Sequence, residues 1–157
     1  MAINFTPKVG QILECDYGDY QLDAKGGRII HANYRIPPEM IKNRLVVVLN
    51  GKIDPSACLV VPLSTTHDHQ KTFKGIHAEI PTAEIPDFRF FKQQIRWAKA
   101  DLIQQVSKER LNRPRTDRGH EPVLLSHAIV DEIQRAVIKA INASGLITPL
   151  PVQNGTP

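Results

Sequence analysis

Several common signals of cell location and of cofactor binding are missing from the sequence. The first ten residues, MAINFTPKVG, contain no apolar core, so we expect no secretory signal. No apolar run approaches the roughly 18 residues that a membrane-spanning helix needs. The sequence also lacks a Walker loop, a dinucleotide-binding fingerprint, a nucleophile elbow and zinc-finger spacing. We therefore expect no membrane span, no cofactor and no bound metal.

Cysteine is scarce as well. Cys15 and Cys58 are the only two, they are far apart, and no Cys-x-x-Cys spacing exists. Both lie in strand-like patterns, which favours buried, reduced thiols in a cytoplasmic protein. The charge is mildly basic, with 20 Lys and Arg against 16 Asp and Glu. This excess permits a polyanionic partner such as nucleic acid but does not require one.

Apolar patterns predict strands in the first half of the chain. Residues 9–18, VGQILECDYG, alternate as a half-buried strand does. Residues 18–43 are rich in glycine, proline and charge, and predict a long loop. Residues 45–49 are uniformly apolar and end at Asn50-Gly51, which is typical of a buried strand before a turn. Residues 57–63, ACLVVPL, are its expected antiparallel partner.

The second half predicts shorter elements and one strong helix. We expect a polar loop at 66–74, a short strand at 75–80, an alternating strand at 95–103 and a basic linker at 112–122. Ser126 is the expected N-cap of the helix, and Gly145 is its expected stop. The predicted fold class is mainly β with a C-terminal helix, in the form of a small barrel or curled sheet. A chain of 157 residues fits one domain. We place this domain at residues 1–145 and a Pro-rich disordered tail at 146–157.

Arg44 lies at the mouth of the apolar strand 45–49. A guanidinium held there can bind a phosphate through two parallel N–H donors, or it can pair with a carboxylate such as Glu39. Ser64 and Thr65 close the partner strand. If the two strands form a hairpin, these hydroxyls lie at the same end of the sheet as Arg44. They then form either part of a phosphate cradle or ordinary caps of a strand end.

Three further segments each leave two interpretations open. His67 and His69 indicate a metal or acid–base site, or a solvated loop. Residues 88–97, FRFFKQQIRW, mix aromatic and cationic side chains as single-strand binders do, or they serve a core or a dimer interface. Arg113 and Arg115 follow a phosphate backbone or are plain solvated charge.

The order of these segments resembles the MazF/PemK family of bacterial toxins. The resemblance covers roughly residues 8–144 and rests on VGQILECDYG, KNRLVVVLN, CLVVPLSTT, AKADLIQQVSKERL and the closing helix, in that order. It implies an SH3-like or CcdB/MazF-type small barrel that forms a homodimer. It also implies a toxin that cleaves single-stranded RNA at specific sequences without a metal and is inhibited by a cognate acidic antitoxin.

The resemblance also implies roles for individual residues. The family's basic residue at the opening of the second strand matches Arg44, and its Ser or Thr at the end of the third strand matches Ser64, so these two are the expected catalytic residues. RNA cleavage through the substrate's own 2′-hydroxyl leaves a 2′,3′-cyclic phosphate and a 5′-hydroxyl. The expected substrate-binding residues are Lys42, Thr65, His67, Arg113 and Arg115.

The chain departs from the family at three positions, one of which is Ser64, where Thr is commoner and the hydroxyl is kept. Leu45 stands where a proline is common, and Gln104 stands where many members have Lys or Arg. Asp101 matches a recurrent Asp whose role is structural or dimer-related. Two alternatives stay open: a non-catalytic toxin of the same fold that binds DNA gyrase, and a plain barrel interaction module. The first alternative would place its determinants in the terminal helix, which carries no aromatic hook.

Overall fold

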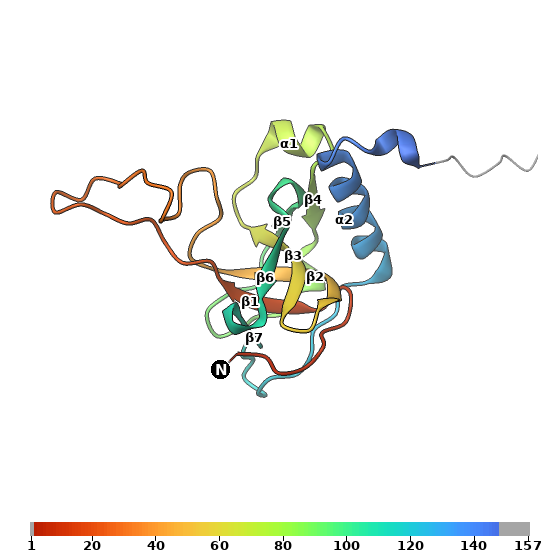
Figure 1. Cartoon of the computed structure of the whole chain (residues 1–157). Coiled ribbons are helices and arrows are strands. Elements are labelled where there is room, and N and C mark those ends of the chain that lie inside the picture. Colours follow the sequence, from red (N-terminus) through yellow and green to blue (C-terminus); the bar gives the residue numbers. More distant parts are fainter. Residues whose placement is uncertain (1, 148–157) are drawn as a thin grey trace, which may run out of the picture.

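The computed structural model, which describes residues 2–147, is a curled antiparallel sheet with one long helix packed on it (Figure 1). The strands are β1 (Ile12–Asp16), β2 (Asn43–Asp54), β3 (Ala57–Ser64), β4 (His77–Ile80), β5 (Arg96–Lys99), β6 (Gln104–Ser107) and β7 (Leu111–Asn112). The helices are α1 (His69–Phe73) and α2 (His127–Ala140), and short 3₁₀ turns are η1 (Thr82–Glu84), η2 (Ala100–Leu102), η3 (Lys108–Arg110) and η4 (Ser144–Leu146). The predicted fold class is confirmed. Most of the predicted tail, residues 148–157, lies outside the described residues.

β3 organises the sheet because three strands pair with it. β2 runs antiparallel along one edge, with Val46 opposite Pro62 and Val48 opposite Val60. The other edge of β3 is divided: β6 pairs with its first half and β5 with its last two residues. Pro62 lies between these two partners, and a proline has no N–H to donate to a neighbouring strand. The sheet therefore changes partner at this proline, and this change helps it to curl.

The two faces of β2 and β3 belong to two different hydrophobic cores. One face packs against α2 and includes Leu45, Val47, Val61 and Leu63 together with Ile133 of the helix. The other face contributes Val46, Val48, Cys58 and Val60 to a second core with Cys15 and Tyr17 of the β1 region. Burial on both faces explains why the predicted strand is continuously apolar rather than alternating. Both cysteines are buried and unpaired, as predicted, and burial raises the pKa of the Cys15 thiol to about 12.

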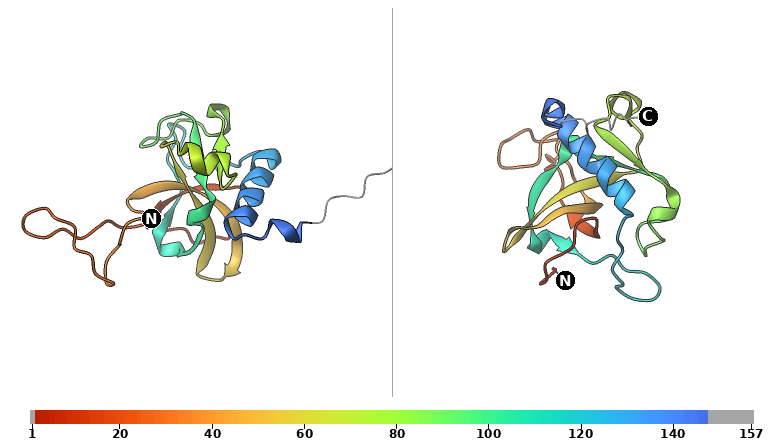
Figure 2. Two further views of the ribbon diagram at one scale, coloured as in Figure 1. Left: turned by 90° about the horizontal axis from the view of Figure 1, so that it is seen from above. Right: turned by 90° about the vertical axis from the view of Figure 1, so that its right-hand side faces the viewer.

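The long loop is confirmed, but the turn predicted at Asn50-Gly51 is wrong. Residues 18–42 contain no regular element beyond an isolated bridge between Leu22 and Arg28, and they project from the sheet on the side opposite α2 (Figures 1 and 2). Asn50-Gly51 does not end the strand, because β2 continues to Asp54 through a register shift. Gly51 is required there because a Cβ atom would collide with the carbonyl oxygen of Pro7.

The caps of α2 also differ from the prediction. Ser126 is the N-cap residue as expected, but its side chain makes no capping bond and its hydroxyl donates to Glu84 Oε1 at 3.0 Å. Gly145 is not the stop: the helix ends at Ala140, and Asn142 adopts the left-handed conformation at φ 58°. Asparagine tolerates this region better than most residues, so it serves where glycine was expected. The predicted polar loop at 66–74 contains α1, which is capped by Asp68 accepting from the Lys71 N–H at 3.0 Å.

No helix within residues 2–147 has the length and apolar character needed to cross a membrane.

Candidate functional site

The pairing of β2 with β3 places Arg44 and Ser64 at the same end of the sheet. The register joins Val46 to Pro62, so moving two residues further along each antiparallel strand brings position 44 opposite position 64. Both positions lie within their strands, which span Asn43–Asp54 and Ala57–Ser64. The sheet therefore brings together the two residues that the sequence predicts as catalytic.

A cavity of about 310 Å³ opens at this end of the sheet. Its lining combines cations, a hydroxyl, an amide and two aromatic rings, with no carboxylate among the described residues that line it. The lining residues are Arg44, Leu45, Leu63, Thr65, Phe90, Phe91, Lys92, Gln94 and Arg96. A pocket with this composition favours an anionic ligand that also has a flat or apolar part.

Arg44 does not make the ion pair that the alternative interpretation requires. Glu39 instead pairs with Arg35 at 3.6 Å and accepts a hydrogen bond from the Ile36 N–H at 3.0 Å. The Nε of Arg44 donates to the carbonyl oxygen of Ile41 at 3.1 Å, which fixes the direction of the half-buried side chain. Within residues 2–147, Arg44 has no carboxylate partner. Its charge is therefore available to a ligand in the cavity.

The two candidate hydroxyls differ in their surroundings. Ser64 is only 7% exposed, and its Oγ accepts a hydrogen bond from the Thr66 N–H at 3.1 Å. It does not line the cavity, whereas the exposed Thr65 beside it does. The end of β3 thus offers two neighbouring hydroxyls. The buried hydroxyl of Ser64 orders the strand end, and the exposed Thr65 lines the cavity.

Arg96 was not among the individually predicted site residues, although it lies in the mixed segment 88–97. It is 5% exposed, it lines the cavity, and its Nη2 donates to the carbonyl oxygen of Lys92 at 2.9 Å. Its Nε is buried and finds no hydrogen-bond partner among the residues that the structure describes. Burial lowers the pKa of this guanidinium. The available signal was its place in the alternating segment 95–103, where Arg96 shares the inward parity of the buried residues Ala98 and Ala100.

The remaining predicted binding residues are spread around this end and the underside of the sheet. Lys42 is exposed beside Arg44 with φ 68°. The ring of His67 stacks on the ring of Trp97, with the ring centroids 4.5 Å apart and an angle of 7° between the ring planes. The carbonyl oxygen of Arg115 accepts a bond from the Arg89 N–H at 2.7 Å, which joins the basic linker to the cavity wall.

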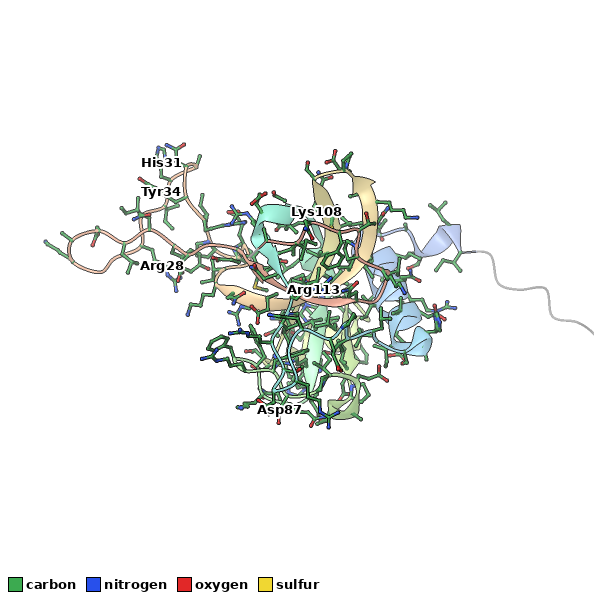
Figure 3. The ribbon with its side chains drawn as sticks, turned by 90° about the horizontal axis from the view of Figure 1, so that it is seen from below. Arg28, His31, Tyr34, Asp87, Lys108 and Arg113 are labelled. Atoms are coloured by element: carbon green, nitrogen blue, oxygen red, sulfur yellow. The ribbon has the colours of Figure 1, made fainter. Side chains whose placement is uncertain are left out.

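Arg113 lies apart from the Arg44 cavity. Its Cζ is 4.3 Å from the ring centroid of Phe5, and it lines a second cavity of about 320 Å³ with the N-terminal segment and His120. Figure 3 shows Arg113 under the sheet, away from the projecting loop that carries Arg28, His31 and Tyr34. The structure therefore does not bring Arg113 together with Arg44.

His77 in β4 belongs to a structural network. Its Nε2 lies 2.7 Å from Asp101 Oδ1, and the Lys71 ammonium lies 2.7 Å from Asp101 Oδ2. These bonds join β4, η2 and α1. Asp101 thus has a structural position within the chain, and no cluster of three or more His, Cys, Asp or Glu side chains in residues 2–147 could hold a metal ion.

The chain is similar to known proteins in its sequence family, in two relatives and in its fold. The sequence model of the PemK-like, MazF-like toxins of type II toxin–antitoxin systems matches residues 25–141. YifN of Escherichia coli is 62% identical over 148 residues, covering 94% of this chain and 99% of that protein. An uncharacterized protein of Haemophilus influenzae is 43% identical, covering 90% and 94%. A solved structure, an endoribonuclease from a mycobacterial species, has a TM-score of 0.52 at 13% identity and covers 89% of this chain and 95% of that one, which shows the shared fold.

Proposed function

Because the chain belongs to the PemK-like, MazF-like toxin family of type II toxin–antitoxin systems, we propose that it is an endoribonuclease that cleaves single-stranded RNA at specific sequences without a metal ion. The observation that carries this proposal is the carboxylate-free cavity in which Arg44 and Thr65 meet at the end of β2 and β3. An endoribonuclease among the proteins that share the fold supports it. A non-catalytic binding module would need no unpaired guanidinium beside a hydroxyl at this position.

The proposed reaction uses the RNA's own 2′-hydroxyl as nucleophile. The 2′-oxygen attacks the adjacent phosphorus in line, the bond from phosphorus to the 5′-oxygen breaks, and the products are a 2′,3′-cyclic phosphate and a 5′-hydroxyl. The proton lost from the 2′-oxygen passes to water, and the departing 5′-oxygen takes a proton from solvent or from Arg44. No other reactant is needed for the atoms to balance.

Arg44 supplies the electrostatic contribution. Negative charge gathers on the phosphoryl oxygens in the transition state, and a fixed cation in a partly dry cavity stabilises it more than water does. The hydrogen bond to Ile41 holds the guanidinium in place before the substrate arrives. A hydroxyl at the end of β3, from Ser64 or Thr65, orients the phosphate for in-line attack. Lys42 and Arg115 attract the neighbouring phosphates.

The assembly is proposed on the same basis. We expect a homodimer, with α2 as the candidate for its interface, because residues of segment 88–97 line the Arg44 cavity. We also expect a cognate acidic antitoxin, because a cavity that binds phosphate accepts carboxylates as well. The projecting loop 18–42 is placed to move when RNA or antitoxin arrives. Protease cleavage in this loop that is equally fast with and without the partner would argue against such movement.

The test is cleavage of RNA by purified protein in EDTA, with the RNA ends mapped. We expect Arg44→Ala to lower the cleavage rate by a factor on the order of 10² to 10⁴, because one charge-stabilising group is removed. Arg35→Ala is the matched control, since that arginine already pairs with Glu39. A need for added magnesium, or wild-type cleavage by Arg44→Ala, would refute the proposal. Binding of gyrase without RNA cleavage would favour the non-catalytic alternative.

The two hydroxyls can be separated by paired substitutions. If the catalytic hydroxyl is that of Ser64, Ser64→Ala loses most activity and Ser64→Thr keeps it. If it is that of Thr65, Thr65→Val loses activity and Thr65→Ser keeps it. Because Ser64 accepts the bond from Thr66, Ser64→Ala must also be checked for unchanged thermal stability.

A further inference from the structure

Two arginines line the cavity, but the family resemblance accounts for only one of them. Arg96 is 5% exposed, whereas arginine is almost never buried to this degree unless it is paired. Within residues 2–147, neither Arg96 nor Arg44 has a carboxylate partner, and Arg96 has only a carbonyl oxygen on Nη2. A buried, unpaired cation is unfavourable in the free protein, and an anion in the cavity would remove this penalty.

The wall of the cavity adds an aromatic surface. Phe90 is 71% exposed, although a phenylalanine ring usually finds burial. Phe91, the next residue, is half-buried, and the Cζ of Arg96 lies 5.8 Å from the Phe91 ring centroid. Two hydrogen bonds hold the backbone of this wall in place. The backbone N–H of Arg89 donates to the carbonyl oxygen of Arg115, and the side-chain amide of Gln93 donates to the carbonyl oxygen of Thr82 at 2.9 Å. The exposed ring therefore lies on a fixed segment.

We propose that segment 88–96 forms a nucleotide-binding subsite, in which the guanidiniums of Arg44 and Arg96 bind one RNA phosphate and the ring of Phe90 stacks on the adjacent base. The pairing of cations with an open aromatic ring is the arrangement by which proteins bind single-stranded nucleic acid. The cavity volume of about 310 Å³ lies at the low end of the range of about 300–1,000 Å³ for small-molecule sites, which suits one nucleotide rather than a folded partner. Gln94 lies in the same lining and presents an amide that can read a base edge.

This subsite rests on the proposed RNA cleavage, but its test does not depend on cleavage. The probe is a short fluorescein-labelled 2′-O-methyl RNA of mixed sequence, which lacks the attacking hydroxyl and stays intact. We expect Phe90→Ala to weaken binding roughly 5- to 150-fold, the range that corresponds to one lost base stack. Phe90→Tyr should bind as the wild type does. Phe73→Ala is the matched control, because Phe73 is 93% exposed in α1 and does not line the cavity.

Arg96 is tested with two variants because the residue is buried. Arg96→Lys keeps the charge and the long stem but loses the fork of donors, and Arg96→Gln loses the charge. Both variants should bind the RNA probe more weakly at unchanged thermal stability, and Arg96→Gln should show the larger loss of binding. Arg135→Gln, on the exposed surface of α2, controls for a general loss of positive charge.

The outcomes separate this subsite from the proposed function. If the wild type cleaves RNA and Phe90→Ala and both Arg96 variants bind the probe as it does, the subsite is refuted and the nuclease stands. If the wild type binds the probe through these residues but cuts no RNA, the subsite stands and the nuclease falls. Failure of the wild type to bind the probe refutes the subsite. Poly-glutamate serves as a second probe. If the Phe90 and Arg96 variants lose binding to poly-glutamate but bind RNA as the wild type does, the nucleotide subsite is refuted in favour of a site for an acidic peptide.

Discussion

Asp101 offers the sharpest test of how β4, η2 and α1 are held together, because the structure gives it two partners with very different exposure. The side chain of His77 is 1% exposed and that of Lys71 is 43% exposed. Asp101→Ala would leave the buried Nε2 of His77 without an acceptor, while its Nδ1 already lacks a partner among the described residues. An unsatisfied buried group costs about 1–3 kcal/mol, and the half-exposed lysine pair adds at most about 1 kcal/mol.

We therefore expect Asp101→Ala to lower the free energy of unfolding by about 1–4 kcal/mol, or the Tm by about 2–16 °C for a chain of this length. Urea unfolding followed by the fluorescence of Trp97 measures this change, since Trp97 is the only tryptophan and lies in β5 beside β4. Lys71→Met is the matched control and should cost less than about 1 kcal/mol. Equal losses in the two variants, or a loss below about 0.5 kcal/mol in Asp101→Ala, would refute the reasoning.

The same network predicts that acid weakens the fold. Burial lowers the pKa of His77 below its usual 6.5, although the Asp101 carboxylate opposes this. Below about pH 6.5 His77 is protonated in the unfolded chain but stays neutral in the folded protein. The free energy of unfolding therefore decreases as the pH is lowered. Burial acts to raise the pKa of Asp101, but hydrogen bonds from Lys71 and His77 outweigh it and lower the pKa. The stability from Asp101 is therefore lost only at still lower pH. His77→Gln should flatten the profile between about pH 7 and pH 5.

Two further predictions concern RNA binding and the end of α2. Lys42→Gln should weaken binding of uncleavable single-stranded RNA and reduce the salt slope by about 0.7, the value for one phosphate contact; an unchanged slope would exclude that contact. Asn142→Val should lower the free energy of unfolding by about 1–2 kcal/mol because a β-branched residue is strained at φ 58°, whereas Asn142→Gly should be close to neutral. Equal stability of the two Asn142 variants by urea titration would contradict the left-handed conformation.

Local composition was enough to predict the main strands and the terminal helix. Burial on both faces demands a continuous apolar run, so residues 45–49 and 57–63 indicated paired strands without any knowledge of their neighbours. A hairpin of two antiparallel strands then places Arg44 and Ser64 at one end, whatever the rest of the fold does. The long loop followed from its glycines, prolines and charges.

Other features depended on contacts between distant segments, which a single sequence does not display. Asn50-Gly51 is typical of a turn, yet β2 continues through it to Asp54, and the close approach of Pro7 explains why position 51 is glycine. In the sequence, Arg96 is one of several cations in a mixed segment. It becomes buried beside the cavity because β5 packs against β3 in the fold.

The mainly β architecture, the closing helix and the cation beside the strand end follow from periodicity and chain direction, which can be read in the sequence. The tertiary fold sets which groups surround that cation. It paired Glu39 with Arg35, which left Arg44 available. It turned Ser64 toward the Thr66 N–H and left Thr65 at the cavity. Burial and pairing are properties of the assembled sheet, since each depends on residues that are far apart in the chain and meet only when the strands associate.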